Sequence, residues 1–148
     1  MFKKVLIANR GAIAVRIIRT LRNLGIESVS VYTKADQDSV HVDLADEAIL
    51  IGEGPVQDSY LNKDLILQTA LDVGACAIHP GYGFLSENSD FATACEQNGI
   101  VFIGPTPEQM NMFGLKHSAR EIAERAHVPL LPGTSLITDQ DVAVSEAA

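Results

Sequence analysis

Short apolar runs alternate with longer, more polar segments along this chain of 148 residues. Five runs rich in Val, Ile, Leu and Ala have the length of buried strands, namely residues 4–8, 28–33, 48–51, 75–78 and 100–103. Strands that are regularly separated by helices predict an α/β fold with a parallel sheet. Because crossovers between parallel strands are right-handed, we expect helices on both faces of that sheet.

The segments between these runs carry helical signals. Residues 12–24 have an apolar face at helical spacing, and Gly25 is expected to end that helix. The face consists of Ile13, Ile17, Leu21 and Leu24. Further helices are expected at residues 41–45, 62–72, 89–97, 108–112 and 116–126, with another beginning near residue 139. Thr106 followed by Pro107 is typical of a helix start.

The charge of the chain argues against some classes of binding partner. The formal net charge is −8, the pI is about 4.8 and there is no Trp, which argues against binding to nucleic acid or to an anionic membrane. The basic residues are nevertheless concentrated in residues 1–34, which hold seven of the eleven Lys and Arg. Cys76 and Cys95 are nineteen positions apart without a CxxC pattern, so neither a disulfide framework nor a cysteine zinc site is expected. A reducing, cytoplasmic location fits this pattern.

In an open parallel sheet, function is expected where the strands end at their carboxyl side. Gly11 is the only glycine after the first strand where a dinucleotide-binding turn needs three, which disfavours a dinucleotide-dependent oxidoreductase. Arg10 there either approaches an anion or forms a local ion pair. The second loop, residues 79–88, reads HPGYGFLSEN; its polar groups either build a site or stabilise a turn, with Ser86 or Asn88 capping the next helix.

Two further features have a functional and a plain interpretation. Lys116 at a helix start either contacts a phosphate or is an ordinary exposed lysine. Arg16, Arg19 and Arg22 recur three apart, as a partner surface or as a solvated helix face. No metal-ligand spacing is present.

Five segments resemble the N-terminal part of biotin carboxylase, in order along the chain. They are residues 7–14 (IANRGAIA), 45–47 (ADE), 59–62 (SYLN), 79–88 (HPGYGFLSEN) and 102–105 (FIGP). Residues 113–117 (FGLKH) and 128–134 (VPLLPGT) further resemble urea carboxylase, whereas acetyl-CoA, propionyl-CoA and pyruvate carboxylases more often have Gly-Asp-Lys where this chain has Gly114, Leu115 and Lys116. A guanidine-preferring relative would look nearly identical here.

The resemblance implies a Rossmann-like three-layer domain of an ATP-grasp ligase. Such enzymes use ATP, Mg²⁺ and bicarbonate to carboxylate a biotin held on a separate carrier domain, and the urea type passes the carboxyl group to urea to give allophanate. By the same resemblance Lys116 contacts ATP, while Tyr82, Gly83 and Glu87 border the biotin and bicarbonate side of the cleft. The helix with Arg16, Arg19 and Arg22 then lies at a homodimer contact.

The resemblance also sets expectations for the extent of the chain. Residues 1–112 would form the biotin carboxylase N-terminal domain, and residues 113–148 a linker helix and the start of the ATP-grasp region. The family's second ATP lysine, glycine-rich lid, magnesium glutamates and catalytic base are not matched, so we expect this chain alone to be inactive and to hold no cofactor tightly. Position 12 departs from the family pattern because Ala12 stands where a glutamate is usual. A non-catalytic dimerisation module is the competing interpretation.

Overall fold

The structure, a computed structural model, describes residues 1–134 and 137–146. The chain divides into two compact units, Met1–Pro107 and Glu108–Ala148, which we describe separately.

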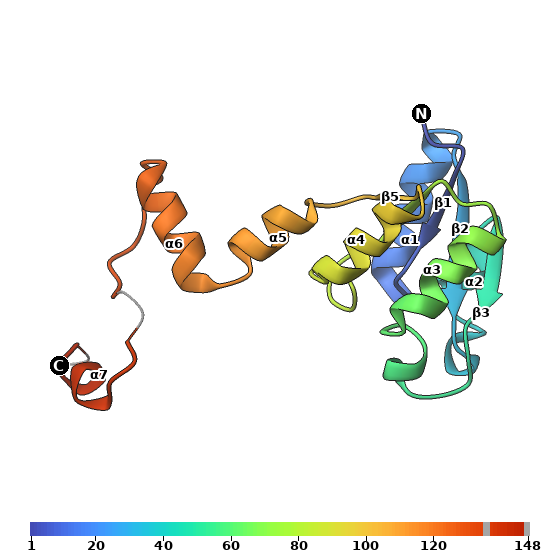
Figure 1. Ribbon diagram of the computed structural model, residues 1–148. Coiled ribbons are helices and arrows are strands. Elements are labelled where there is room, and N and C mark those ends of the chain that lie inside the picture. Colours follow the sequence, from blue (N-terminus) through green and yellow to red (C-terminus); the bar gives the residue numbers. More distant parts are fainter. Residues whose placement is uncertain (135–136, 147–148) are drawn as a thin grey trace. The chain divides into compact units, whose positions relative to one another are not determined.

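The first unit is built on a five-stranded sheet with the order β3-β2-β1-β4-β5, and every neighbouring pair of strands is parallel (Figure 1). The strands are β1 (Lys4–Ile7), β2 (Glu27–Tyr32), β3 (Glu47–Leu50), β4 (Ala77–His79) and β5 (Val101–Phe102). This sheet confirms the predicted α/β fold.

Four α-helices and two 3₁₀ turns connect these strands. They are α1 (Gly11–Asn23), α2 (Val40–Leu44), α3 (Lys63–Asp72), α4 (Ser89–Gln97), η1 (Lys34–Asp36) and η2 (Val56–Asp58). Helix α1 packs against α2, and α3 packs against α4. The strand order runs outward in one direction through β2 and β3 and in the other through β4 and β5. Right-handed crossovers therefore place the two helix pairs on opposite faces.

The core has one apolar layer on each side of the sheet. Val5 and Ile7 of β1 face the α1 side, where Ile17 and Ile18 are also buried. Successive residues of a strand point to opposite faces, so Leu6 belongs to the other layer. There the rings of Phe91 and Phe102 meet edge to face, with their centroids 6.0 Å apart.

Two local expectations need correction at helix ends. Leu24 is 54 % exposed rather than part of the inward face of α1, because the helix ends there and Gly25 turns the chain back at φ +68°. The amide of Ile26 donates to the carbonyl of Leu21, and Ile26 takes the buried place. Likewise β4 begins at Ala77 instead of residue 75, because the amide of Ala75 is used in closing the end of α3.

The second unit holds α5 (Pro107–Phe113) except for its first residue, together with α6 (Lys116–Arg125) and α7 (Gln140–Glu146). Helix α5 begins at Pro107, as expected for a proline in a first helical turn. In α6 the guanidinium of Arg120 pairs with Glu124 at 3.2 Å and donates to the carbonyl of Leu131 at 3.0 Å. Among the described residues, no helix has both the length and the apolar character needed to span a bilayer.

Candidate functional site

The strand order reverses between β1 and β4, and open parallel sheets bind ligands in the crevice at such a point. Asn9 follows β1, and the loop of residues 80–88 follows β4. The side-chain amide of Asn9 donates to the carbonyl oxygens of Pro80 at 2.7 Å and of Tyr82 at 2.8 Å. The structure thus joins the two loops that the sequence placed at the same sheet edge.

Positive backbone φ angles shape the loop after β4. Gly81 and Gly83 both have φ of +67°, and Phe84, which is not a glycine, has φ of +42°. A Cβ atom on Gly81 would lie 2.7 Å from Nδ2 of Asn9, so only glycine fits there. The amide of Gly81 donates to Nδ1 of His79 at 3.0 Å, and burial lowers the pKa of His79.

The loop is fixed on its inner side and open on its outer side. The ring of Phe84 stacks on Tyr60 with centroids 5.1 Å apart and planes 7° apart. Tyr82, by contrast, is 68 % exposed. Together with the first turn of α1, Tyr82 and Gly83 line a cavity of about 360 Å³. Glu87, the third residue predicted for this loop, is exposed and is not among the residues that line this cavity.

Helix α4 begins just after this loop, and Asn88 rather than Ser86 supplies its cap. The side-chain oxygen of Asn88 accepts from the amide of Phe91 at 2.8 Å. The amide of Ser86 instead donates to the carbonyl of Gly83 at 2.9 Å.

A buried carboxylate next to the crevice organises the side chains that support the loop. Asp36 is 4 % exposed and accepts hydrogen bonds from Arg10, from the hydroxyl of Thr33 at 3.0 Å and from that of Tyr60 at 2.8 Å. Arg10 therefore forms the local ion pair that was one of its two interpretations. The guanidinium of Arg10 holds the pKa of Asp36 below its usual range, while burial raises that of Tyr60 to about 12.

Sequence reasoning missed this network of Arg10, Thr33, Asp36 and Tyr60. One available signal was that Asp36 follows the second strand at the same sheet edge as Arg10. Tyr60 gave no comparable signal, since only the packing of the loop before α3 brings it under Asp36.

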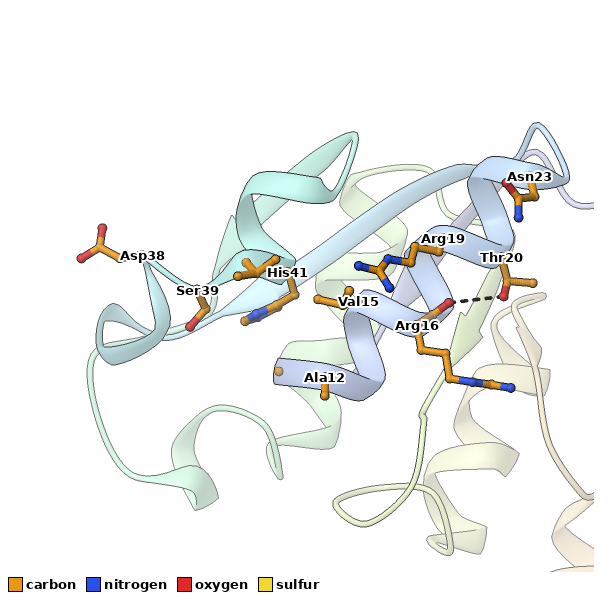
Figure 2. Close-up of a pocket in the computed structure, with 11 residues that line it drawn as sticks. Ala12, Val15, Arg16, Arg19, Thr20, Asn23, Asp38, Ser39 and His41 are labelled. Carbon is orange, nitrogen blue, oxygen red and sulfur yellow. Dashed lines mark hydrogen bonds between the residues drawn. The ribbon is translucent and has the colours of Figure 1, made fainter.

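A second, larger cavity of about 830 Å³ lies between α1 and the segment of residues 38–41. Arg16 and Arg19 line it, and Figure 2 shows both side chains projecting from α1. Within the described part of the chain neither of them forms an ion pair. Arg22 does not line this groove; its guanidinium donates to the carbonyl of Leu44 at 2.6 Å.

His41 is a buried residue of the same groove. It is 0 % exposed, and neither ring nitrogen has a hydrogen-bond partner in the structure described. Burial lowers the pKa of His41, and the carboxylate of Asp36 opposes that shift.

Lys116, the predicted phosphate contact, is the first residue of α6 in the second unit, and its side chain is exposed. Cys76 and Cys95 are both free thiols, and Cys95 is buried. Across residues 1–134 and 137–146, no group of three His, Cys, Asp or Glu side chains could hold a metal ion.

Comparisons with known proteins agree on one family. A model described as "Biotin carboxylase, N-terminal domain" matches residues 1–110. Biotin carboxylase of Halalkalibacterium halodurans is 56 % identical over 145 residues, which are 97 % of this chain and 32 % of that protein. Urea amidolyase of Lachancea kluyveri is 55 % identical over 137 residues, which are 93 % of this chain and 8 % of that protein.

Solved structures give the same result. The urea carboxylase of Kluyveromyces lactis matches 88 % of this chain and 12 % of its own with a TM-score of 0.85 and 54 % identity. A biotin carboxylase domain dimer of the 2-oxoglutarate carboxylase of Hydrogenobacter thermophilus, in complex with MgADP, ADP and bicarbonate, matches 99 % of this chain and 32 % of its own with a TM-score of 0.92 and 49 % identity. The chain spans about a third of the length of the curated biotin carboxylases it matches, at 30–33 %.

Proposed function

The chain belongs to the biotin carboxylase family through its N-terminal domain, and from this premise we propose that it serves as the first domain of a biotin-dependent carboxylase. The complete enzyme would be an ATP-dependent ligase that uses ATP and bicarbonate to carboxylate biotin on a carrier domain. The observation that carries this proposal is 56 % identity with a biotin carboxylase over 97 % of the chain. Two free cysteines support a reducing, cytoplasmic location.

The loop after β4 is the part of this chain that we assign to biotin. Tyr82 is exposed on the loop, and Gly83 lines the adjoining cavity without a side chain, so a ligand can approach the backbone closely. Bound biotin would supply the nitrogen that accepts the carboxyl group. Glu87 lies farther along the same loop, and we assign it with Tyr82 and Gly83 to the biotin and bicarbonate side of the cleft.

We assign ATP to Lys116 in the second unit. Its exposed ammonium group stands at the first position of α6 and can meet phosphate oxygens as a mobile point charge. We derive no step through Mg²⁺, which the complete enzyme would hold at the phosphates of ATP.

The assays for this proposal separate the chain from the complete enzyme. We expect the 148-residue chain alone to show no bicarbonate-dependent ATP hydrolysis, and such hydrolysis would contradict our assignment of most catalytic groups to other segments. The gene sequence after codon 148 should encode a glycine-rich lid, followed by a carrier segment. A stop codon there, with no partner gene that encodes these parts, would overturn the proposed role.

For the acceptor we propose urea, with allophanate as the product. The FGLKH and VPLLPGT segments support it, and urea carboxylases are among the relatives that this chain matches. Guanidine, acetyl-CoA, propionyl-CoA and pyruvate are the alternatives. ATP turnover by the complete enzyme should depend on urea; turnover that depends on guanidine instead would reassign the acceptor.

A dimer contact is the second proposed role, and the groove of α1 favours it. Arg16 and Arg19 lie there together without an ion pair among the described residues, and the 2-oxoglutarate carboxylase relative is a domain dimer. Sedimentation should show a dimer that Arg16→Glu or Arg19→Glu dissociates, whereas Arg125→Glu on α6 serves as the control. A monomer at all concentrations would remove this role, including the contribution expected of Arg22.

A further inference from the structure

The backbone of the loop after β4 is held by a side chain from another strand end. We propose that Asn9 is a positioning residue for the biotin-facing loop, residues 80–84, and that it sets the place of Tyr82 and Gly83. This inference rests on the proposed assignment of the loop to biotin. Asn9 would act without touching biotin itself.

The amide group of Asn9 uses all of its polar atoms in defined contacts. Nδ2 donates to the carbonyls of Pro80 and Tyr82, and Oδ1 accepts from the amide of Arg10 at 2.9 Å. Asn9 is only 3 % exposed, so water does not compete for these bonds. Because only an NH₂ group can face two carbonyl oxygens, the plane and orientation of the amide are determined.

The loop depends on Asn9 because hydrogen bonds within the loop do not hold its central residues in place. No other hydrogen bond to the carbonyls of Pro80 or Tyr82 occurs among the described residues. Gly83 and Phe84 both have positive φ, a conformation that a phenylalanine adopts only when its surroundings impose it. Asn9 holds one side of this segment, and the stack of Phe84 on Tyr60 holds the other.

Tyr82 shows why the anchor matters for a ligand. Its side chain is 68 % exposed and forms no hydrogen bond in the described structure, so its place follows from the backbone alone. Asn9 binds the carbonyl of this same residue. Loss of the anchor should therefore weaken biotin binding, while ATP binding, assigned to Lys116 in the other unit, should be unaffected.

The test uses the complete biotin carboxylase that carries this segment. Asn9→Asp keeps the size of the side chain and the acceptor for Arg10, but it places a carboxylate against two carbonyl oxygens. We expect the KM for free biotin to rise at least tenfold and the KM for ATP to change less than twofold. Asn98→Asp is the matched control, because Asn98 also donates to a carbonyl, that of Ala94, at the end of α4 that is away from the loop. It should change neither constant.

A double-mutant cycle with Tyr82→Ala tests whether Asn9 acts through the loop. In the Tyr82→Ala enzyme, Asn9→Asp should raise the KM for biotin less than threefold. If Asn9→Asp prevents folding, Asn9→Ser, which keeps one hydroxyl donor, should give a smaller rise of the same kind. An unchanged KM for biotin, or equal rises for biotin and ATP, overturns the inference. An unmodified enzyme without biotin-dependent ATP cleavage refutes the proposed function instead.

Discussion

Removal of the single hydroxyl of Tyr60 tests the buried network most directly. Tyr60→Phe keeps the ring that stacks on Phe84, but it removes the donor to Asp36 and the acceptor at 3.3 Å from the amide of Thr33. A hydrogen bond to a charged group contributes about 1.5–3 kcal/mol, and an orphaned buried amide costs about 1–3 kcal/mol. We expect the variant to be about 3 kcal/mol less stable at pH 7 in urea unfolding followed by far-UV circular dichroism.

The pH dependence of stability gives a second, independent value for the contribution of the Tyr60 hydroxyl to the free energy of unfolding. Burial, with the Asp36 carboxylate, raises the pKa of Tyr60 from 10.0 to about 12. A folded-state pKa above the unfolded value stabilises the protein fully below pH 10, and this contribution is lost as the pH rises toward 12. Two pKa units correspond to about 3 kcal/mol. The difference in unfolding free energy between wild type and Tyr60→Phe should therefore shrink over this range.

Tyr32→Phe serves as the control for Tyr60→Phe. Tyr32→Phe also removes a phenol hydroxyl, but that hydroxyl forms no hydrogen bond in the described residues, so its stability should change by less than about 0.5 kcal/mol. A Tyr60→Phe protein as stable as wild type at pH 7 would refute the reasoning. A difference that stays constant from pH 8 to 11.5 would refute the assigned pKa.

Three further substitutions test the core and the helix starts by the same unfolding assay. Phe91→Ala removes a ring that is 0 % exposed and should cost about 3–5 kcal/mol, and a loss below 1 kcal/mol would contradict the packing described. Asn88→Ala removes the cap of α4 and should cost about 1 kcal/mol, whereas Asn88→Ser should retain most of that stability. Ala12→Glu places an acid in the first turn of α1, which has none, and should add about 0.5 kcal/mol relative to Ala12→Gln; no difference between the two would exclude a helix-dipole effect.

Much of the fold follows from local sequence signals. Apolar runs predicted all five strands, and helical spacing with capping residues predicted the helices between them. The errors lie at helix ends. Leu24 is the instructive error. Its spacing matches the buried face of α1, but the turn at Gly25 ends the helix and buries Ile26 instead. Periodicity describes a continuing helix and carries no information on where the chain leaves it.

The candidate site was likewise predicted from the sequence only in part. The sequence alone determined the family and indicated the loop with Tyr82 and Gly83, because glycines and polar residues gather within a few positions there. The tertiary structure alone decided that Asn9 holds this loop and that Asp36 joins Arg10 to Tyr60, contacts that span 73, 26 and 24 positions. The contacts of Asn9 and Arg10 form because the order of the parallel strands brings distant carboxyl ends to one edge of the sheet. Tyr60 reaches Asp36 because the loop before α3 packs against that edge.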